Sequence, residues 1–325
     1  MAHPTTTTTT TVHRTRRSPD YELIKRATEH DPEKWALDLN GALPNGTKNK
    51  SGYAMDCTQY PQSVSKALSG ATARAADGVV NATAKQVQDL KWYMALCTNV
   101  YCPNVIVNDV WDCPYCNMTD DLDIIKTFNT KKEDTNVLVA RGDKEKGIFI
   151  AFRGSGSAKN WIANLDFILV DYPPADGTKV HKGFFDSYND VANELTPLVK
   201  ELAGNYSDYA IHVTGHSLGA ATALLCAMDL YEQGLKPSLY TFGGPRVGDP
   251  AFAEYVVGTK ILYERTVNKR DLVAHLPPAA FGYRHAGQEF WITEDESVVI
   301  CPNGVESDSC SNSIVPFTST SDHTE

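Results

Sequence analysis

The sequence predicts an α/β fold, in which helices cover both faces of a mostly parallel central sheet. Between residues 136 and 267, short apolar runs typical of strands alternate with longer runs of helical pattern. Such alternation requires crossover helices, which place consecutive parallel strands in one sheet. A second observation is the pentapeptide Gly215–Gly219 (GHSLG), which directly follows a strand-like run and precedes a helix-like run.

The expected elements follow one another in a regular order. A helix over residues 83–100 opens the series, since Val87, Leu90 and Met94 recur at helical spacing. The expected strands cover residues 136–140, 147–152, 209–214, 238–242 and 263–267, and the later helices cover residues 184–204 and 220–233.

Composition divides the chain into three segments. Residues 1–19 contain an unbroken threonine run and an arginine cluster, so we expect a disordered low-complexity leader. Residues 20–74 are mostly polar and are expected to form a pro-region. Small residues crowd into 69–78, and this shift marks the start of a compact catalytic domain over residues 75–325.

Bulk properties exclude several classes of protein. The 325 residues are 42% apolar, which suffices for a large core, and carry a net charge of −10. This charge argues against a nucleic-acid partner and against attraction to anionic membranes. No apolar run approaches 18 residues, so we expect no transmembrane segment.

The cysteines favour an oxidising compartment. Among the eight cysteines, the close pairs Cys113/Cys116 and Cys301/Cys310 are spaced as short disulfide loops. A C-x-x-C pair can also be a redox centre or half of a zinc site. However, Cys113 and Cys116 occupy a turn-like stretch, and a second such pair is absent from the sequence, so we expect disulfides and no metal.

Glycosylation signals agree with secretion. Five N-x-S/T sequons begin at Asn45, Asn49, Asn81, Asn117 and Asn205. The first residues nevertheless lack the apolar core of a signal peptide. We therefore expect a secreted glycoprotein that either leaves the cell by an unusual route or has a leader not included in this sequence.

Ser217 has the sequence context of a nucleophile elbow, a strained strand-to-helix turn that exposes a serine at the top of the sheet. The backbone N–H of the following residue, Leu218, is expected to help bind an oxyanion. In this arrangement an acid and then a histidine follow the serine along the chain. Asp271, just after a strand, is favoured over Asp249, whose neighbour Pro250 indicates a helix N-cap.

The residues alone leave the catalytic base open among three histidines. His275 lies only four residues after Asp271, which makes reach to both the acid and Ser217 awkward. His285 lies in what looks like a surface turn, and His323 lies in a late loop. Spacing does not decide between the last two.

Several stretches together resemble the secreted fungal class 3 triacylglycerol lipases of the Rhizomucor and Rhizopus type, over roughly residues 75–323. They are residues 152–155 (FRGS), 159–162 (KNWI), 178–184 (TKVHKGF), 244–250 (GPRVGDP), 271–278 (DLVAHLPP) and 309–319 (SCSNSIVPFTS).

The resemblance implies an α/β-hydrolase that needs no cofactor. It implies that Ser217 is the nucleophile, Asp271 the acid and His323 the base, and that Ser155 joins Leu218 in the oxyanion hole. It further implies a monomeric lipase zymogen acting on ester substrates at an oil–water interface.

An apolar stripe, with Ala158, Trp161, Ile162 and Leu165 at helical spacing, is by pattern alone typical of an ordinary surface helix. The resemblance favours a lid over the active site. The expected lid residues are Ala158, Lys159, Asn160, Trp161, Ile162, Ala163 and Asn164.

The sequence also departs from the family. Polar residues Thr320, Ser321 and Thr324 flank His323 where apolar ones are usual. The family's C-terminal tail, whose final cysteine pairs with the position of Cys102, is absent from this sequence, so Cys97 becomes a conceivable partner. A loose C-terminus at this point would leave His323 poorly positioned, so the sequence leaves its function open.

Two further functions therefore stay open beside a lipase: an esterase for soluble esters, similar to feruloyl esterases, and a lipase-like binding protein with impaired catalysis.

Overall fold

The computed structural model describes residues 78–324, apart from residues 303 and 316. The expected leader (1–19) and pro-region (20–74) lie outside the described residues. None of the helices in the described part is long and apolar enough to cross a membrane.

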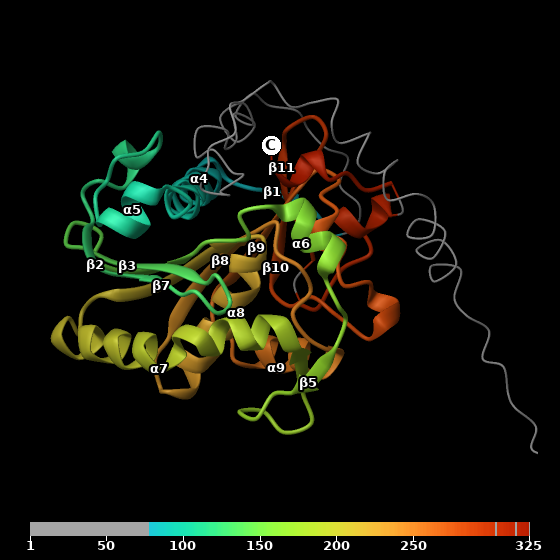
Figure 1. Ribbon diagram of the computed structural model, residues 1–325. Coiled ribbons are helices and arrows are strands. Elements are labelled where there is room, and N and C mark those ends of the chain that lie inside the picture. The colour runs from blue at the N-terminus through green and yellow to red at the C-terminus, as the bar shows by residue number, and fades with distance from the viewer. Residues whose placement is uncertain (1–77, 303, 316, 325) are drawn as a thin grey trace, which may run out of the picture. The chain divides into compact units, whose positions relative to one another are not determined.

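A nine-stranded sheet forms the centre of the fold, in the order β1-β11-β10-β9-β8-β7-β4-β3-β2 (Figure 1). Five adjacent strands run parallel, and the sequence predicts all of them except the last: β4 (Gly147–Phe152), β7 (Ala210–His216), β8 (Pro237–Phe242), β9 (Tyr263–Asn268) and β10 (Gln288–Ile292). Antiparallel strands complete both edges: β2 (Asp123–Asn129) and β3 (Asn136–Gly142) on one, β11 (Val298–Ile300) and β1 (Val80–Asn81) on the other. The short hairpin of β5 (Leu169–Asp171) and β6 (Lys179–His181) is separate.

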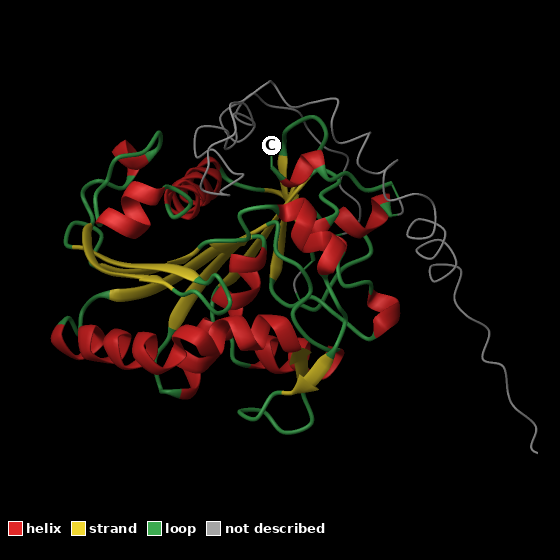
Figure 2. Cartoon of the chain, in the orientation of Figure 1, coloured by secondary structure: helices red, strands yellow, loops and turns green. Residues whose placement is uncertain are grey.

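Helices cover both faces of the sheet (Figure 2). One apolar core is shared by the sheet with α7 (Lys182–Asn205), α8 (Leu218–Glu232) and α9 (Pro250–Gly258). The other is shared with α4 (Ala84–Asn99) and α5 (Pro103–Asn108). The remaining helical pieces are α6 (Ala158–Asn164) and the 3-10 turns η1 (Cys116–Met118), η2 (Val273–His275), η3 (Ala279–Phe281), η4 (Ser311–Ile314) and η5 (Ser321–His323).

The strand residues alternate between these two cores. In β4, Ile148 and Ile150 pack on the α7 and α8 side, whereas Phe149 and Ala151 pack on the α4 side. This explains why the central strands read as continuous apolar runs, because both of their faces are buried.

Side-chain caps fix where two of the helices begin. Thr83 and Gln86 form a reciprocal capping box at the start of α4. Asp249 caps α9 by accepting a hydrogen bond from the N–H of Phe252 at 2.8 Å, with Pro250 in the first turn. Asp249 therefore caps a helix, as the sequence indicates, and Asp271 remains the candidate acid.

Candidate active site

Ser217 occupies a sharp turn between β7 and α8. Its backbone lies at φ 59° and ψ −129°, a strained conformation for a residue with a side chain. The residue is 1% exposed. The turn is closed by main-chain contacts, since a Cβ on Gly219 would lie 2.7 Å from the carbonyl carbon of Arg153. A Cβ on Gly215 would lie 2.5 Å from the carbonyl carbon of Gly219. The two glycines thus let strand and helix approach closely enough to form the elbow.

Asp271 and His323 form a buried pair, 1% and 4% exposed. The Nδ1 atom of His323 lies 3.0 and 3.1 Å from the two carboxylate oxygens, and the N–H of Val273 donates to Oδ1 at 2.8 Å. Because a carboxylate only accepts hydrogen bonds, Nδ1 carries the proton. The lone pair of Nε2 is then free to accept a proton.

Two buried polar atoms in this region are unsatisfied. Among the described residues, neither the hydroxyl oxygen of Ser217 nor Nε2 of His323 forms a hydrogen bond. Buried polar atoms are normally paired, so each unpaired one needs an explanation, and a catalytic role is one. These two are the atoms between which a serine hydrolase transfers its proton.

The segment that carries His323 is anchored beside the acid. The N–H of Leu272 donates to the carbonyl of Ser319 at 2.9 Å, and the N–H of Ser319 donates to the carbonyl of Arg270 at 2.7 Å. The carboxylate of Asp322 accepts from the N–H of Arg270 at 3.1 Å. Local pairing with residues 270–272 thus holds the segment whose order the sequence left open. No pattern in the sequence indicated Asp322 as a brace.

The other two histidines bond to the backbone. His275 places Nδ1 2.7 Å from the carbonyl oxygen of Asp271 and Nε2 3.1 Å from that of Ser311. His285 is 4% exposed, and its Nε2 donates to the carbonyl of Ala274 at 2.7 Å. The expectation that His285 lies in a surface turn is wrong. Burial, above all, lowers the pKa of His285 well below its usual value.

The expected oxyanion donors lie at the same edge of the sheet. Leu218 is the first residue of α8, so its N–H has no acceptor within the helix. Phe152 ends β4 and pairs in parallel register with Gly215 of β7, so the turn through Ser155 leaves the sheet beside the elbow. Helix N-terminal N–H groups favour developing negative charge.

Helix α6 follows that turn directly, and its sequence forms the expected short helix. Ser157 caps it by accepting from the N–H of Asn160 at 3.3 Å. Trp161 is half-buried, and its ring stacks against that of Phe184 with centroids 6.1 Å apart. Ile162 is also half-buried. Within the apolar stripe, Trp161 and Leu165 pack against the apolar core.

Both expected disulfides are present, Cys113–Cys116 and Cys301–Cys310. Cys97 forms no disulfide, and its sulfur is hydrogen-bonded to the hydroxyl of Thr214 at 2.9 Å. Cys97 is therefore not the disulfide partner of Cys102, a pairing that the sequence left conceivable.

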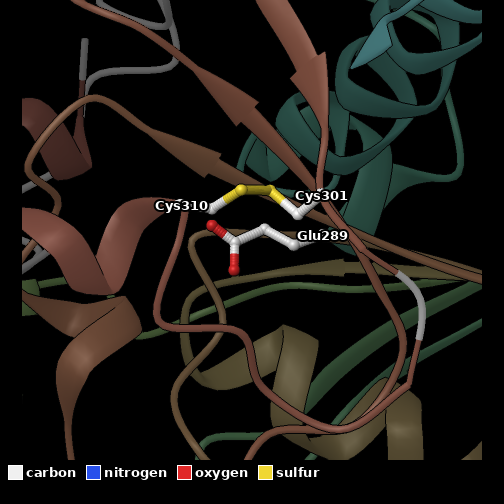
Figure 3. A group of neighbouring side chains, drawn as sticks. All are labelled: Glu289, Cys301 and Cys310. Carbon is white, nitrogen blue, oxygen red and sulfur yellow. A yellow bond between two sulfur atoms is a disulfide. The ribbon is translucent and has the colours of Figure 1, made fainter. Parts of the chain in front are cut away.

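One cluster in the described part of the chain has the residue types of a metal site, Glu289 with Cys301 and Cys310 (Figure 3). Its sulfurs are joined in the disulfide. The carboxylate of Glu289 pairs with Arg265 at 2.7 Å and accepts from the N–H of Ser311 at 2.9 Å. The atoms that would bind a metal are therefore already bonded within the protein, and the cluster has a structural role.

Known proteins are similar to this chain in both sequence and fold. The family model for lipase (class 3) matches residues 149–281. A lipase of Rhizomucor miehei is 55% identical over 300 residues, which are 90% of this chain and 81% of the relative.

Two solved structures agree with this match. One is a triacylglycerol lipase whose catalytic centre is a serine protease triad, at 56% identity and a TM-score of 0.74, covering 76% of this chain and 96% of that chain. The other is the Rhizomucor miehei lipase propeptide complex, at 53% identity and a TM-score of 0.75, covering 90% and 91%. The chain has the α/β-hydrolase fold and belongs to the class 3 lipase family.

Proposed function

We propose that this protein is a secreted triacylglycerol lipase that cleaves ester bonds with Ser217, Asp271 and His323. The observation that carries the proposal is the His323–Asp271 hydrogen bond, which leaves Nε2 of the histidine without a partner. The hydroxyl of Ser217, on the elbow, is also unpartnered among the described residues. A relative at 56% identity has a serine protease triad, which supports these roles.

The mechanism follows from these positions. Ser217 attacks the ester carbonyl while Nε2 of His323 takes the hydroxyl proton, and Asp271 stabilises the resulting imidazolium. The N–H groups of Leu218 and Ser155 bind the oxyanion of the tetrahedral intermediate. Losing one such donor typically costs about 3–4 kcal/mol in the transition state. His323 then protonates the leaving alcohol, and water releases the fatty acid from the acyl-enzyme.

Residues 158–164 are the proposed lid. In water the apolar stripe stays against the protein, because exposing Trp161 and Ile162 fully would cost roughly 3–6 kcal/mol. An oil surface removes that cost, so the helix can leave the site when the enzyme reaches its substrate. The lid thereby favours hydrolysis of triacylglycerol at the oil–water interface.

Secretion and a pro-region complete the proposal. The two disulfides suit an oxidising compartment, and the sequon residues Asn81, Asn117 and Asn205 are exposed. Residues 20–74 are proposed as the pro-region, since a lipase at 53% identity forms a propeptide complex. The mature enzyme is proposed to act as a monomer.

The experiment compares wild-type protein with Ser217→Ala, using Ser313→Ala, a change at an exposed serine, as the control. Wild type and the control should release fatty acid from a triacylglycerol emulsion and form one covalent adduct with a p-nitrophenyl phosphonate. Ser217→Ala should do neither.

The alternatives give different results. Fast cleavage of feruloyl or short soluble esters without hydrolysis of the emulsion would identify an esterase. A folded wild-type protein that forms no adduct would identify a binding protein.

A further inference from the structure

A ladder of side-chain hydrogen bonds joins α4 and its C-terminal end to β7. Positions 93, 97 and 101 advance four residues at a time, about 6 Å in a helix. Positions 212, 214 and 216 advance two at a time, about 6.6 Å in a strand, so the rungs stay in register. The rungs are Tyr93 with His212 at 2.9 Å, Cys97 with Thr214 at 2.9 Å, and Tyr101 with His216 at 2.8 Å.

Only the third of these rungs continues into the active site. The N–H of Gly154, in the turn that leads to Ser155, donates to the hydroxyl oxygen of Tyr101 at 3.0 Å. At the other end of the rung, Nε2 of His216 lies 3.3 Å from the carbonyl oxygen of His323. His216 immediately precedes the nucleophile. The rung therefore connects the oxyanion turn, the elbow and the backbone of the base.

The direction of each hydrogen bond can be assigned. His216 is 2% exposed, and burial, followed by the proximity of His323, lowers its pKa well below the usual value, so its ring is neutral. A carbonyl only accepts, hence the single ring proton lies on Nε2 and is donated to His323. Nδ1 must then accept, which makes the Tyr101 hydroxyl the donor.

The ring of His216 also packs on that of the base. The two imidazoles stack with centroids 4.7 Å apart and an angle of 27° between their planes. His323 becomes positively charged when it takes the serine proton, and a second positive ring at this distance would oppose that step. A neutral His216, with its tautomer fixed by Tyr101, avoids the repulsion.

We propose that Tyr101 and His216 are positioning residues for the hydrolysis. Through continuous hydrogen bonds they hold the backbone of His323 and the turn before Ser155 at fixed positions around Ser217. Neither residue is assigned a contact with the ester. The inference rests on the proposed function.

The test uses two tyrosine variants that remove the same chemical group. Tyr101→Phe removes the hydroxyl that reaches the active site. Tyr93→Phe removes the hydroxyl that bonds to His212 on the same strand, four residues from His216. Both are assayed on a soluble short-chain p-nitrophenyl ester, with melting temperature measured in parallel.

We expect both variants to lower the melting temperature by similar amounts. Tyr101→Phe should also lower kcat by roughly 10- to 100-fold with little change in KM, as for a misplacement of up to about 1 Å. Its rate of reaction with the phosphonate should fall in parallel. Tyr93→Phe should keep kcat within about two-fold of wild type.

Each outcome decides the proposal. Equal kcat values for the two variants, at similar melting temperatures, would overturn the positioning role while an active wild type leaves the proposed function standing. A rise in KM alone would also contradict it, since the residues would then act on ester binding. An inactive wild type that forms no adduct would overturn both proposals.

Discussion

The proposed nucleophile and the proposed base are held in place by different kinds of interaction. Ser217 lies between a central strand and a buried helix, and the backbone contacts of Gly215 and Gly219 fix its turn. His323 lies in a short 3-10 turn, three residues long, and depends on hydrogen bonds to Asp271 and on the bracing of Asp322. The position of the serine thus depends on the packing of the sheet, whereas that of the histidine depends on a few hydrogen bonds of a short segment.

This difference predicts two kinds of failure. A change in the elbow forces the backbone to move, which damages stability and activity together. A change around His323 removes one weak hydrogen bond among several, which misplaces the base while most of the fold persists. The predictions below run from the largest expected effect to the smallest.

Gly219→Ala should have the largest effect. The added Cβ would lie 2.7 Å from the carbonyl carbon of Arg153, so β4 and α8 must separate. We expect destabilisation by about 1–3 kcal/mol and a loss of about 100-fold or more in kcat/KM. Urea unfolding and ester hydrolysis measure the two effects.

The matched control is Gly204→Ala in α7, where, apart from the adjacent residues and the local helix backbone, no described atom lies within 4 Å of the added Cβ. That variant should be as active as wild type. Wild-type activity and stability in Gly219→Ala would show that the elbow is not held by close backbone contact.

Asp322→Ala should separate activity from stability. It removes the acceptor for the N–H of Arg270, 3.1 Å away, and frees the turn that carries His323. We expect kcat to fall roughly 10- to 100-fold while the free energy of unfolding falls by about 1 kcal/mol. Asp295→Ala is the control, because Asp295 accepts from the N–H of Ser297 at 3.3 Å in a turn between β10 and β11. A larger loss of activity in the control would contradict the bracing role.

Trp161→Ala tests the proposed lid without changing the contacts that hold Ser217 or His323. The activity on a triacylglycerol emulsion should fall about 10-fold, because the helix loses its largest apolar contact with oil. The activity on a soluble ester should change by about two-fold or less. Val107→Ala, at a 61% exposed residue of α5, should affect neither substrate. Equal losses on both substrates would remove the lid from the mechanism.

The smallest effect concerns the pH dependence of stability that comes from the buried ion pair of Arg246 and Glu306. Burial raises the pKa of the Glu306 carboxyl, but the hydrogen bonds and charge of Arg246 outweigh it and hold this pKa well below its usual range. Such a carboxyl contributes stability above its unfolded pKa, near 4.3, and loses that contribution as the pH falls.

Glu306→Gln should therefore lower the melting temperature at pH 7, with a gap from wild type that narrows below about pH 4. Melting curves at several pH values measure this gap. A gap that stays constant, or that widens in acid, would show that the ionised carboxylate is not the stabilising form.

The sequence predicted those parts of the molecule that depend on local pattern. The elbow, the central parallel strands and the cap at Asp249 each follow from residues a few positions apart. The oxidised cysteine pairs were equally local, being three and nine residues apart.

Contacts between distant segments could not be predicted in this way. Asp322 meets Arg270, and Tyr101 meets His216 across 115 residues, so no periodic signal links the partners. His285 looked like part of a surface turn in the sequence, yet tertiary packing buries it. Of the edge strands, β3 was predicted, whereas β1 and β11 were missed because they are only two and three residues long.

The most direct test of the account is the rate of phosphonate labelling and ester hydrolysis in His323→Ala compared with His275→Gln, each shown to be folded by circular dichroism. His323→Ala should lose about 10⁴-fold or more of kcat with its elbow intact, as expected for the loss of a triad member. His275→Gln, which alters only backbone contacts, should lose far less. Retention of hydrolysis by His323→Ala near the wild-type rate would contradict the assignment of the base and, with it, the proposed triad.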